Sequence, residues 1–406
     1  MSRMPIRIAV LWLGFFSAGS PVPAAGDFSK VPGVVIDHSP ASTGRYIGSP
    51  SLAVLPDGTY VASHDFFGPA TREDESVVFA STDKGRTWRQ IARIEGAFWS
   101  GLFVHRGRLY LMGPKQGHGP LVIRRSDDGG RTWTQPRDGR SGLLLAEGRY
   151  HTAPVPVVEH NGRVWRAIED VSGDGGWGRH FRALVMSAPA EADLLDAGSW
   201  TCTNRLASDP GWLGGRFYGW LEGNVVVAPD GGIVNFLRVE MRPGWGTSAI
   251  IRVSSDGRFA EFDPAGGFVP FAGADKKFTI RPDRRTKLYW TLANVILPEH
   301  EGPQPGAIRN AMALMCSADL RKWEQRCIVL YHPDVHKHGF QYVDWLFEDD
   351  DIIAVSRTAY EDGMGGAVRT HDANFMTFHR FRGFRNLTMK DSVWSGRGAA
   401  TKEAPP

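Results

Sequence analysis

The sequence has 406 residues, with 48 glycines, 26 prolines and 14 tryptophans, and a formal net charge of +3. This charge is small for the length and no basic block is present, which excludes a general nucleic-acid or membrane-surface role. Frequent glycine and proline, without runs of helix-forming residues at helical spacing, favour many short strands joined by tight turns. An all-β fold is therefore expected.

The N-terminal residues have the pattern of an export signal. Arg3 and Arg7 precede an apolar run at 8–16, and small residues with a Val-Pro-Ala cleavage pattern follow. We expect residues 1–24 to be a signal peptide and the mature protein to be secreted or periplasmic. No stretch approaches the roughly 20 apolar residues that a membrane span requires.

Two copies of an S-x-D-x-G-x-T-W motif, at 81–88 and 126–133, give the strongest internal repeat. These Asp boxes join pairs of strands, because the Asp and Ser bond turn amides and the Gly permits positive φ. Degenerate copies are expected at 254–257, at 317–323 and at 370–378. We interpret the Asp-box carboxylates as structural, since their spacing serves a turn.

A second type of hairpin alternates with the Asp boxes. Its copies lie at 49–65, 101–113, 152–170, 223–240, 278–294 and 340–360, and their turns are often Pro-Asp-Gly, Asn-Gly or Arg-Gly. Pairing each copy with the outer hairpin that follows gives four antiparallel strands six times. This pattern predicts a single β-propeller over residues 25–406. Six blades are counted, and seven remain open because segment 31–37 or the C-terminal tail can add a blade or close the ring.

The cysteines leave two alternatives open. Cys316 and Cys327 can face each other across one hairpin, so either a disulfide or free thiols fit the sequence, and Cys202 is left over. No Cys and His residues have the spacing of a zinc site, so no metal ligands are expected.

One face of the propeller should carry the chemistry. Inner strands begin and second strands end on this face, whereas the Asp boxes lie on the other. Arg166 and Arg238 are interpreted as equivalent positions in two blades, with both guanidinium groups leaning toward one central pocket. The alternative is that each arginine pairs internally with a nearby glutamate, Glu169 or Glu240. His64 and His151 are the histidines placed nearest to them, and these four residues are the catalytic candidates. The substrate-binding candidates on this face are Tyr46, Trp99, Trp220, Glu222, Lys277, Gln341, Asp344, Arg357 and Tyr360.

Convergent arginines suit a substrate that carries a carboxylate, such as a uronate. In β-elimination, arginine would neutralise the uronate carboxylate and histidine or tyrosine would move the proton. Hydrolysis by two carboxyl groups is the competing route, for which Asp65, Glu169, Glu222 and Asp344 are available. A carbohydrate-binding propeller without turnover is a further alternative.

The Asp boxes are similar to those of sialidases, but the Arg-Ile-Pro signature of that family is absent. The first inner strand instead begins with Tyr-Ile-Gly-Ser-Pro at 46–50. A second likeness spans about residues 35–385. It is carried by HSPAS at 38–42, YIGSPS at 46–51, YVASHD at 60–65, RYHTAP at 149–154, FTIR at 278–281, FQYVDW at 340–345 and SRTAY at 356–360.

These segments resemble the propeller enzymes that remove L-rhamnose capping D-glucuronate in arabinogalactans such as gum arabic. That family is described both as α-L-rhamnosidases and as rhamnose-α-1,4-glucuronate lyases. The resemblance implies a secreted, seven-bladed propeller acting on an acidic oligosaccharide or polysaccharide, with a central histidine and with arginines on the glucuronate carboxylate. The matching positions here are His64, Arg166 and Arg238. A structural calcium ion in the channel is compatible with the architecture, although no dedicated calcium loop is present. A monomer is expected.

Overall fold

The structure is a computed structural model that describes residues 27–172, 176–302 and 305–394. The signal peptide predicted at 1–24 lies outside these residues. Within them, no helix combines the length and the apolar composition needed to cross a membrane.

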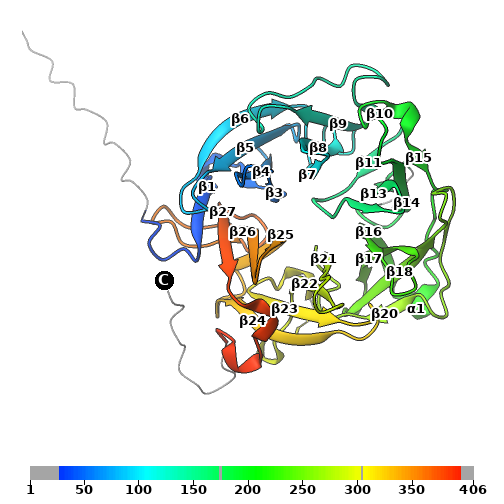
Figure 1. Cartoon of the computed structure of the whole chain (residues 1–406). Coiled ribbons are helices and arrows are strands. Elements are labelled where there is room, and N and C mark those ends of the chain that lie inside the picture. Colours follow the sequence, from blue (N-terminus) through cyan, green and yellow to red (C-terminus); the bar gives the residue numbers. More distant parts are fainter. Residues whose placement is uncertain (1–26, 173–175, 303–304, 395–406) are drawn as a thin grey trace, which may run out of the picture.

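The described chain forms six antiparallel sheets, which surround a central axis as the blades of a propeller (Figure 1). The predicted all-β fold with six blades is confirmed. The first three blades consist of β2 (Tyr46–Ile47), β3 (Ser51–Val54), β4 (Tyr60–Phe67), β5 (Glu75–Ser81) and β6 (Arg89–Glu95); β7 (Gly101–His105), β8 (Arg108–Pro114), β9 (Leu121–Ser126) and β10 (Leu143–Leu145); and β11 (Tyr150–His151), β12 (Val158–His160), β13 (Arg163–Asp170), β14 (Arg182–Pro189) and β15 (Thr201–Cys202).

The next three blades complete the ring. They consist of β16 (Phe217–Val227), β17 (Ile233–Met241), β18 (Thr247–Val253), β19 (Ala260–Glu261) and β20 (Phe268–Pro270); β21 (Thr279–Pro282), β22 (Tyr289–Asn294), β23 (Ala311–Ser317) and β24 (Glu324–Tyr331); and β25 (Gly339–Glu348), β26 (Asp351–Ala359), β27 (Phe375–Phe381) and β1 (Val34–His38). The short helical turns are α1 (Trp212–Gly215), η1 (Ala41–Thr43), η2 (Ala197–Ser199), η3 (Pro298–His300), η4 (Pro305–Ala307), η5 (Phe384–Asn386) and η6 (Met389–Asp391).

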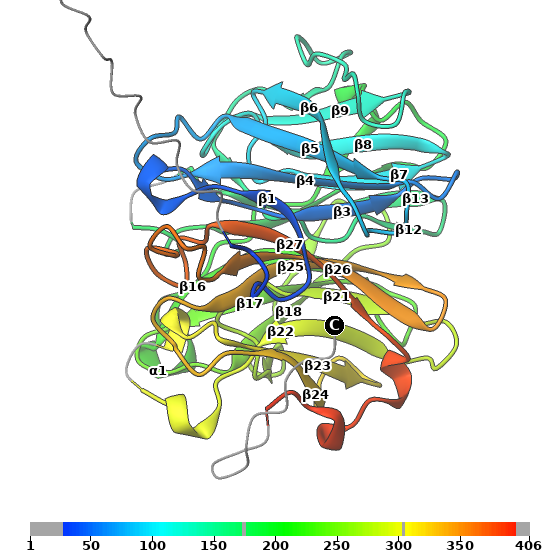
Figure 2. The same cartoon turned by 90° about the vertical axis from the view of Figure 1, so that its left-hand side faces the viewer.

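The N-terminal strand β1 closes the ring. It pairs antiparallel with β27, with Val34 opposite Phe378, and supplies the fourth strand of blade six (Figure 2). Hydrogen bonds between the two ends of the chain thus close the ring within one blade. Segment 31–37 therefore closes the sixth blade, and the seven blades implied by the family resemblance are not found in the described chain.

The Asp boxes at 81–88 and 126–133 form turns between the third and fourth strands of their blades. Asp83 Oδ1 accepts hydrogen bonds from Ser81 Oγ (2.8 Å) and from the Thr87 amide (2.9 Å), and Asp128 makes the corresponding bonds. The copies at 254–257 and 317–323 occupy the same place in blades four and five. The prediction of an Asp box at 370–378 is wrong. Residues 370–372 join the second strand β26 to the third strand β27, so they lie on the face opposite the Asp boxes.

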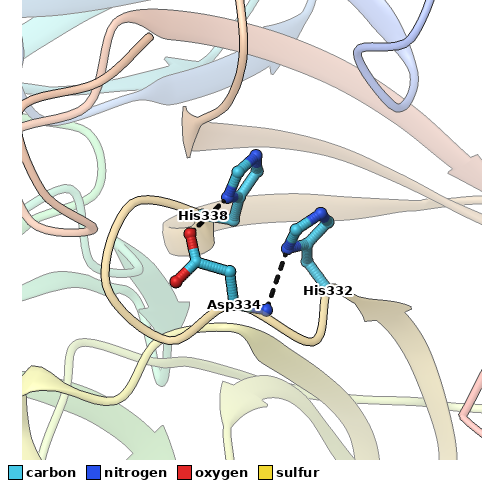
Figure 3. Close-up of side chains that lie close together, drawn as sticks. All are labelled: His332, Asp334 and His338. Atoms are coloured by element: carbon cyan, nitrogen blue, oxygen red, sulfur yellow. Dashed lines mark hydrogen bonds and ion pairs between the residues drawn. The ribbon is translucent and has the colours of Figure 1, made fainter.

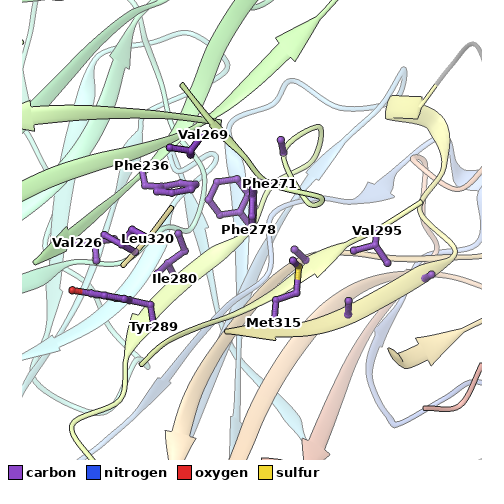
Figure 4. Packing of buried hydrophobic residues seen from close by; sticks show 14 of the residues in the cluster. Val226, Phe236, Val269, Phe271, Phe278, Ile280, Tyr289, Val295, Met315 and Leu320 are labelled. Carbon is purple, nitrogen blue, oxygen red and sulfur yellow. The ribbon is translucent and has the colours of Figure 1, made fainter. Parts of the chain in front are cut away.

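The core lies between the blades. Between blades four and five, Phe236, Phe271 and Phe278 pack together as edge-on rings beside Val226 and Ile280 (Figure 4). Burying a side chain of this size stabilises the fold by about 1.5–3 kcal/mol. The blades are thus held together by apolar side chains, and their strand ends are free to carry polar groups.

The three cysteines are free thiols in the structure. Cys327 lies opposite Leu314, and Cys316 lies opposite Glu324, in the pairing of β23 with β24. The two cysteines are therefore not cross-strand partners, and the disulfide alternative is not realised.

Candidate functional site

Two inner strands carry matching bulges near the axis. The register of β16 and β17 shifts between Leu221 and Asn224, and that of β25 and β26 shifts between Gln341 and Asp344. Within the bulges, Glu222 (φ 56°) and Tyr342 (φ 53°) adopt left-handed backbone. Strain of this kind, of order 1–3 kcal/mol per residue, is concentrated at functional sites.

The bulges bring these two side chains together. The Tyr342 hydroxyl donates a hydrogen bond to Glu222 Oε1 at 2.8 Å. Burial raises the pKa of Tyr342, and the neighbouring Glu222 raises it further. Burial also acts to raise the pKa of Glu222, but Arg238 and His151 outweigh it and leave that pKa below its ordinary value. Glu222 is therefore a carboxylate positioned to accept the phenolic proton.

Three buried arginines surround the pair, and we call Arg238, Arg309 and Arg357 the arginine cluster. Arg238 Nη1 lies 2.8 Å from Glu222 Oε2, and the Arg357 guanidinium lies 4.0 Å from the centre of the Tyr342 ring. The pKa of Arg309 is lowered to about 9, chiefly by burial. Arg238 and Arg357 also lower this pKa, and Tyr342 and Glu222 raise it. The cluster thus concentrates positive charge beside the phenol.

Several donors of this cluster have no partner. Arg238 Nε, Arg357 Nε and both Nε and Nη1 of Arg309 are buried without a hydrogen bond among the described residues, and so is Lys276 Nζ. A buried polar group left unpaired costs about 1–3 kcal/mol. Burial lowers the pKa of Lys276 to about 7, with Asp275 opposing this effect. The unpaired donors fit an anionic ligand, such as a carboxylate.

An aromatic wall adjoins the pair. The centre of the His151 ring lies 4.6 Å from that of Trp99 and 4.9 Å from that of Trp177. His118 stacks on Trp177, with 5.6 Å between the ring centres. His151 Nδ1 lies 2.8 Å from Glu169 Oε2, and Trp177 is 42% exposed. An exposed aromatic surface next to convergent polar groups is typical of a small-molecule site.

The two arginines predicted as a pair lie on opposite faces of their blades. Arg166 shares a face of β13 with Ile168, which packs against blade two, whereas Arg238 shares a face of β17 with Phe236, which packs against blade five. Because side chains alternate along a strand, a difference of one residue in register reverses the face. The interpretation of the two positions as equivalent is wrong. Arg357 is the true counterpart of Arg238, because Arg238 pairs with the residue that precedes the bulge of blade four and Arg357 does the same in blade six.

Arg166 binds the backbone of its own blade. Its Nη2 donates to the Ala153 carbonyl at 2.8 Å, and Nη1 donates to the Val155 carbonyl. Burial lowers its pKa to about 10. These contacts hold the loop between β11 and β12, and Arg166 does not pair with Glu169 as the alternative interpretation expected. Arg238 pairs with Glu222 and not with Glu240.

His64 has both ring nitrogens engaged. Nε2 lies 2.9 Å from Asp37 Oδ2, and Nδ1 lies 2.9 Å from the Asp65 carbonyl oxygen. Asp37 belongs to β1, so His64 joins the closing strand to blade one. The catalytic role of His64 stays a prediction.

The substrate-binding candidates divide into three sets. Trp99, Glu222 and Arg357 belong to the group of residues around Tyr342 described above. Tyr46 packs edge-on against Phe67, Gln341 accepts from Arg357 Nη2 at 3.1 Å, and Tyr360 lies edge-on to His338.

The remaining candidates hold the fold together. Trp220 is fully buried, and its Nε1 donates to the Phe181 carbonyl at 3.0 Å. Asp344 Oδ2 accepts from Ser51 Oγ at 2.9 Å, and Lys277 Nζ donates to the Val343 carbonyl at 2.7 Å. Their contacts join neighbouring blades, and binding roles for them remain predictions.

The sequence analysis missed Tyr342, Arg309, Lys276 and Trp177. Tyr342 stood inside a motif that was singled out, but the choice of polar groups near the start of the inner strand took Gln341 and Asp344 on either side of it. Arg309 lies in the loop between β22 and β23, where no strand periodicity marks it. Lys276 adjoins the selected Lys277, and this buried lysine pair was the available signal.

No family model matches the chain, and no curated protein matches it. Solved structures do match its fold. An α-L-arabinanase of Penicillium chrysogenum complexed with arabinobiose is 14% identical, with a TM-score of 0.54, over 87% of this chain and 98% of that one. An α-L-arabinofuranosidase of Fusarium graminearum with an iminosugar inhibitor is 12% identical, with a TM-score of 0.55, over 86% and 97%. Trypanosoma rangeli sialidase with sialic acid is 15% identical, with a TM-score of 0.55, over 83% and 54%.

The chain has the propeller fold of these enzymes. At such low identities the likeness extends to the fold alone, so the resemblance to rhamnose-glucuronate lyases stays a prediction.

Proposed function

We propose that the protein is a carbohydrate-active enzyme that cleaves the glycosidic bond of a sugar bearing a carboxylate. One observation carries this proposal: the phenol of Tyr342 donates to the Glu222 carboxylate at 2.8 Å, beside buried arginines with unpaired donors. The arginine cluster would hold the substrate carboxylate, and the aromatic wall would pack on the sugar ring. The similarity in fold to glycosidases, including a sialidase, supports this class of reaction.

Hydrolysis through Tyr342 is the favoured route. Glu222 takes the phenolic proton, and the Tyr342 oxygen forms a bond to the anomeric carbon as the glycosidic bond breaks. Sialidases use a tyrosine nucleophile in place of the usual carboxylate. Attack by a phenol beside arginines avoids placing a second carboxylate against the carboxylate of the substrate.

The leaving oxygen needs a proton, and Glu73 on the loop between β4 and β5 is the proposed acid. Burial raises the pKa of Glu73, and the neighbouring Asp65 raises it further, so Glu73 holds a proton to higher pH than an ordinary glutamate. After departure of the leaving group, the Glu73 carboxylate activates water. Water then releases the sugar from Tyr342, and Glu222 returns the proton to the phenol.

Elimination is the second candidate, and the same geometry favours it when the carboxylate belongs to a uronate. Tyr342, deprotonated by Glu222, would remove the C5 proton while the arginine cluster stabilises the enolate. The C4–O bond would then break as the C4–C5 double bond forms, with Glu73 giving its proton to the leaving oxygen. The family resemblance of the sequence points to the terminal L-rhamnose-α-1,4-D-glucuronate linkage as the substrate. A carbohydrate-binding propeller without turnover is the non-enzymatic alternative.

Product analysis tests these routes. The protein is incubated with a rhamnosyl-glucuronate disaccharide and, separately, with a sialoside. Free rhamnose with an intact glucuronate establishes hydrolysis, and rhamnose with ultraviolet absorbance of an unsaturated uronate establishes elimination. If the protein releases sialic acid from the sialoside but does not cleave the disaccharide, its substrate is a sialoside. Binding without any product after long incubation would exclude the enzymatic proposal.

A further inference from the structure

Two imidazoles stack at the entry to β25. The rings of His332 and His338 lie 3.6 Å apart, with 16° between their planes, and Asp334 lies between them on the same loop (Figure 3). The sequence analysis assigned no role to this loop. Half-buried Tyr360 packs edge-on against both rings, at 4.8 Å from His338 and 5.4 Å from His332.

The hydrogen bonds fix which nitrogen of each ring carries a proton. The Asp334 amide donates to His332 Nδ1 at 3.1 Å, so this nitrogen is unprotonated and the neutral ring carries its hydrogen on Nε2. His338 Nδ1 lies 2.7 Å from Asp334 Oδ2 and donates to it, which leaves a lone pair on His338 Nε2. The pKa of His332 is lowered to about 4, chiefly by burial, so His332 is neutral near pH 7.

The two Nε2 atoms form an unused donor and acceptor. Neither has a hydrogen-bond partner within the described parts of the chain, and the nearest carboxylate, Glu361, is 3.9 Å from His338 Nε2. In Figure 3 both atoms lie at the ends of the rings that point away from the Asp334 loop. A donor and an acceptor therefore stand side by side, facing the same way.

The loop is fixed beside the candidate active site. The His332 amide donates to the Asn310 carbonyl at 3.0 Å, and Asn310 Nδ2 donates to the His332 carbonyl at 2.7 Å. Asn310 follows Arg309, whose carbonyl accepts from the Phe340 amide at 2.9 Å. Tyr342 stands four residues after His338, or roughly 13 Å along an extended strand. This distance suits a sugar one or two units from the reacting one.

A metal ion does not fit the stacked rings. A histidine lone pair lies in the plane of its ring, and two nearly parallel planes cannot both direct lone pairs to one point at roughly 2.1 Å. Asp334 is also occupied, because its carboxylate accepts from the amides of His336 (2.8 Å) and Lys337 (3.2 Å). With two imidazoles among three members, the cluster does not bear on the calcium ion considered above, since calcium prefers oxygen ligands.

We propose that His332 and His338 form a sugar subsite that recognises two adjacent hydroxyl groups. One hydroxyl oxygen accepts the Nε2 hydrogen of His332, and the neighbouring hydroxyl donates to Nε2 of His338. The ligand is a neutral sugar with a vicinal diol, linked to the acidic sugar on which Tyr342 acts. This subsite rests on the proposed function and deepens it, because it selects what lies beyond the scissile bond.

Paired substrates test the subsite. The His332→Phe variant keeps an aromatic ring in the stack and removes the Nε2 donor. Its KM should rise about tenfold for a disaccharide of the acidic sugar and a neutral diol-bearing sugar, as for the loss of a hydrogen bond. For the same acidic sugar with a nitrophenyl leaving group, KM and kcat should stay within twofold of wild type. The control is His160→Phe, since His160 Nε2 bonds only the Gly231 carbonyl, at the opposite face. Equal effects on both substrates would overturn the subsite and leave the proposed function intact.

Direct binding separates the two proposals. In the Tyr342→Phe variant, in which the proposed function predicts that turnover is lost, the disaccharide at millimolar concentration should shift the Nε2 nitrogen resonances of His332 and His338. If these shifts occur but the wild-type protein cleaves neither substrate, the subsite is supported and the proposed function fails. Unchanged resonances would overturn the subsite. Tight binding of zinc chloride that is lost in His332→Phe would also overturn it, in favour of a metal site.

Discussion

Tyr342 and Glu222 are 120 positions apart in the chain, yet the hydroxyl of the first lies 2.8 Å from a carboxylate oxygen of the second. Each residue sits in a bulge of an inner strand, Tyr342 in blade six and Glu222 in blade four. The two bulges turn these side chains out of the regular alternation and toward each other.

Replacing Tyr342 by Phe removes one oxygen and keeps the ring under Arg357. If Tyr342 is the nucleophile or base, kcat should fall by at least about 10³-fold. The melting temperature should change little, since only one hydrogen bond is lost. Tyr289→Phe is the control, because its hydroxyl donates to the carbonyl of Val227 at 2.8 Å, at the end of β16 in blade four. Steady-state rates and thermal melts of both variants decide the matter, and near-normal turnover by Tyr342→Phe would exclude its catalytic role.

Arg309→Met should separate stability from function. The Arg309 side chain is buried with two unpaired nitrogens, and burial lowers its pKa to about 9. An apolar side chain of similar length should therefore raise the free energy of unfolding by about 1–2 kcal/mol. The same change should raise KM for the acidic substrate at least tenfold. Urea unfolding and kinetics measure both effects, and a destabilised variant with normal KM would show that Arg309 only supports the fold.

Substrate binding should weaken as pH rises from 6 to 8. The pKa of Lys276 is lowered to about 7, so this lysine is a cation below that pH and neutral above it. A cation beside the arginine cluster favours a bound carboxylate, and its loss should weaken affinity by roughly fivefold to tenfold. Isothermal titration across this range, repeated with Lys276→Met, should give a flat profile for the variant. An unchanged pH profile in Lys276→Met would assign the dependence to another group.

The contacts of His64 with Asp37 and Asp65 predict that His64→Ala lowers stability and leaves turnover nearly intact. The substitution deprives Asp37 of its partner and loosens the attachment of β1 to blade one, at a cost of about 1–3 kcal/mol. The interpretation of His64 as a catalytic residue predicts the reverse, with turnover abolished in a stable protein. Thermal melts and kcat of one variant therefore distinguish the two roles.

Asp83→Ala should lower the melting temperature at neutral pH without changing kcat. Hydrogen bonds from Thr87 and Ser81 lower the pKa of Asp83 from 3.8 to about 2 on folding. The stabilisation by Asp83 is therefore fully present above pH 3.8 and lost as the pH falls through about 2. The difference in melting temperature between wild type and variant should narrow over that interval. A change in turnover would contradict the structural role of the Asp box.

The sequence by itself determined the propeller. Asp boxes and hairpin turns are local patterns, since a turn is made by residues a few positions apart, and they gave six blades of four strands and the face that bears the site. The same reasoning selected Glu222, Arg238, Arg357, His151 and Trp99, which belong to the candidate site, and their roles stay predictions. It went wrong at 370–378, where a local Asp-box likeness has a different place in the blade.

Only the tertiary structure decided which of these side chains meet. The closure of blade six by β1 pairs residues from both ends of the chain, and the bulges at Glu222 and Tyr342 shift the face of each following residue. Selection by place in the repeat assumes that every blade keeps the same register, so it chose Gln341 and Asp344, missed Tyr342 and matched Arg238 with Arg166 in place of Arg357. A bulge inserts one extra residue into a strand and so shifts the register by one. Its backbone strain is offset by contacts with other blades, which are distant in the sequence, so no local sequence pattern identifies it.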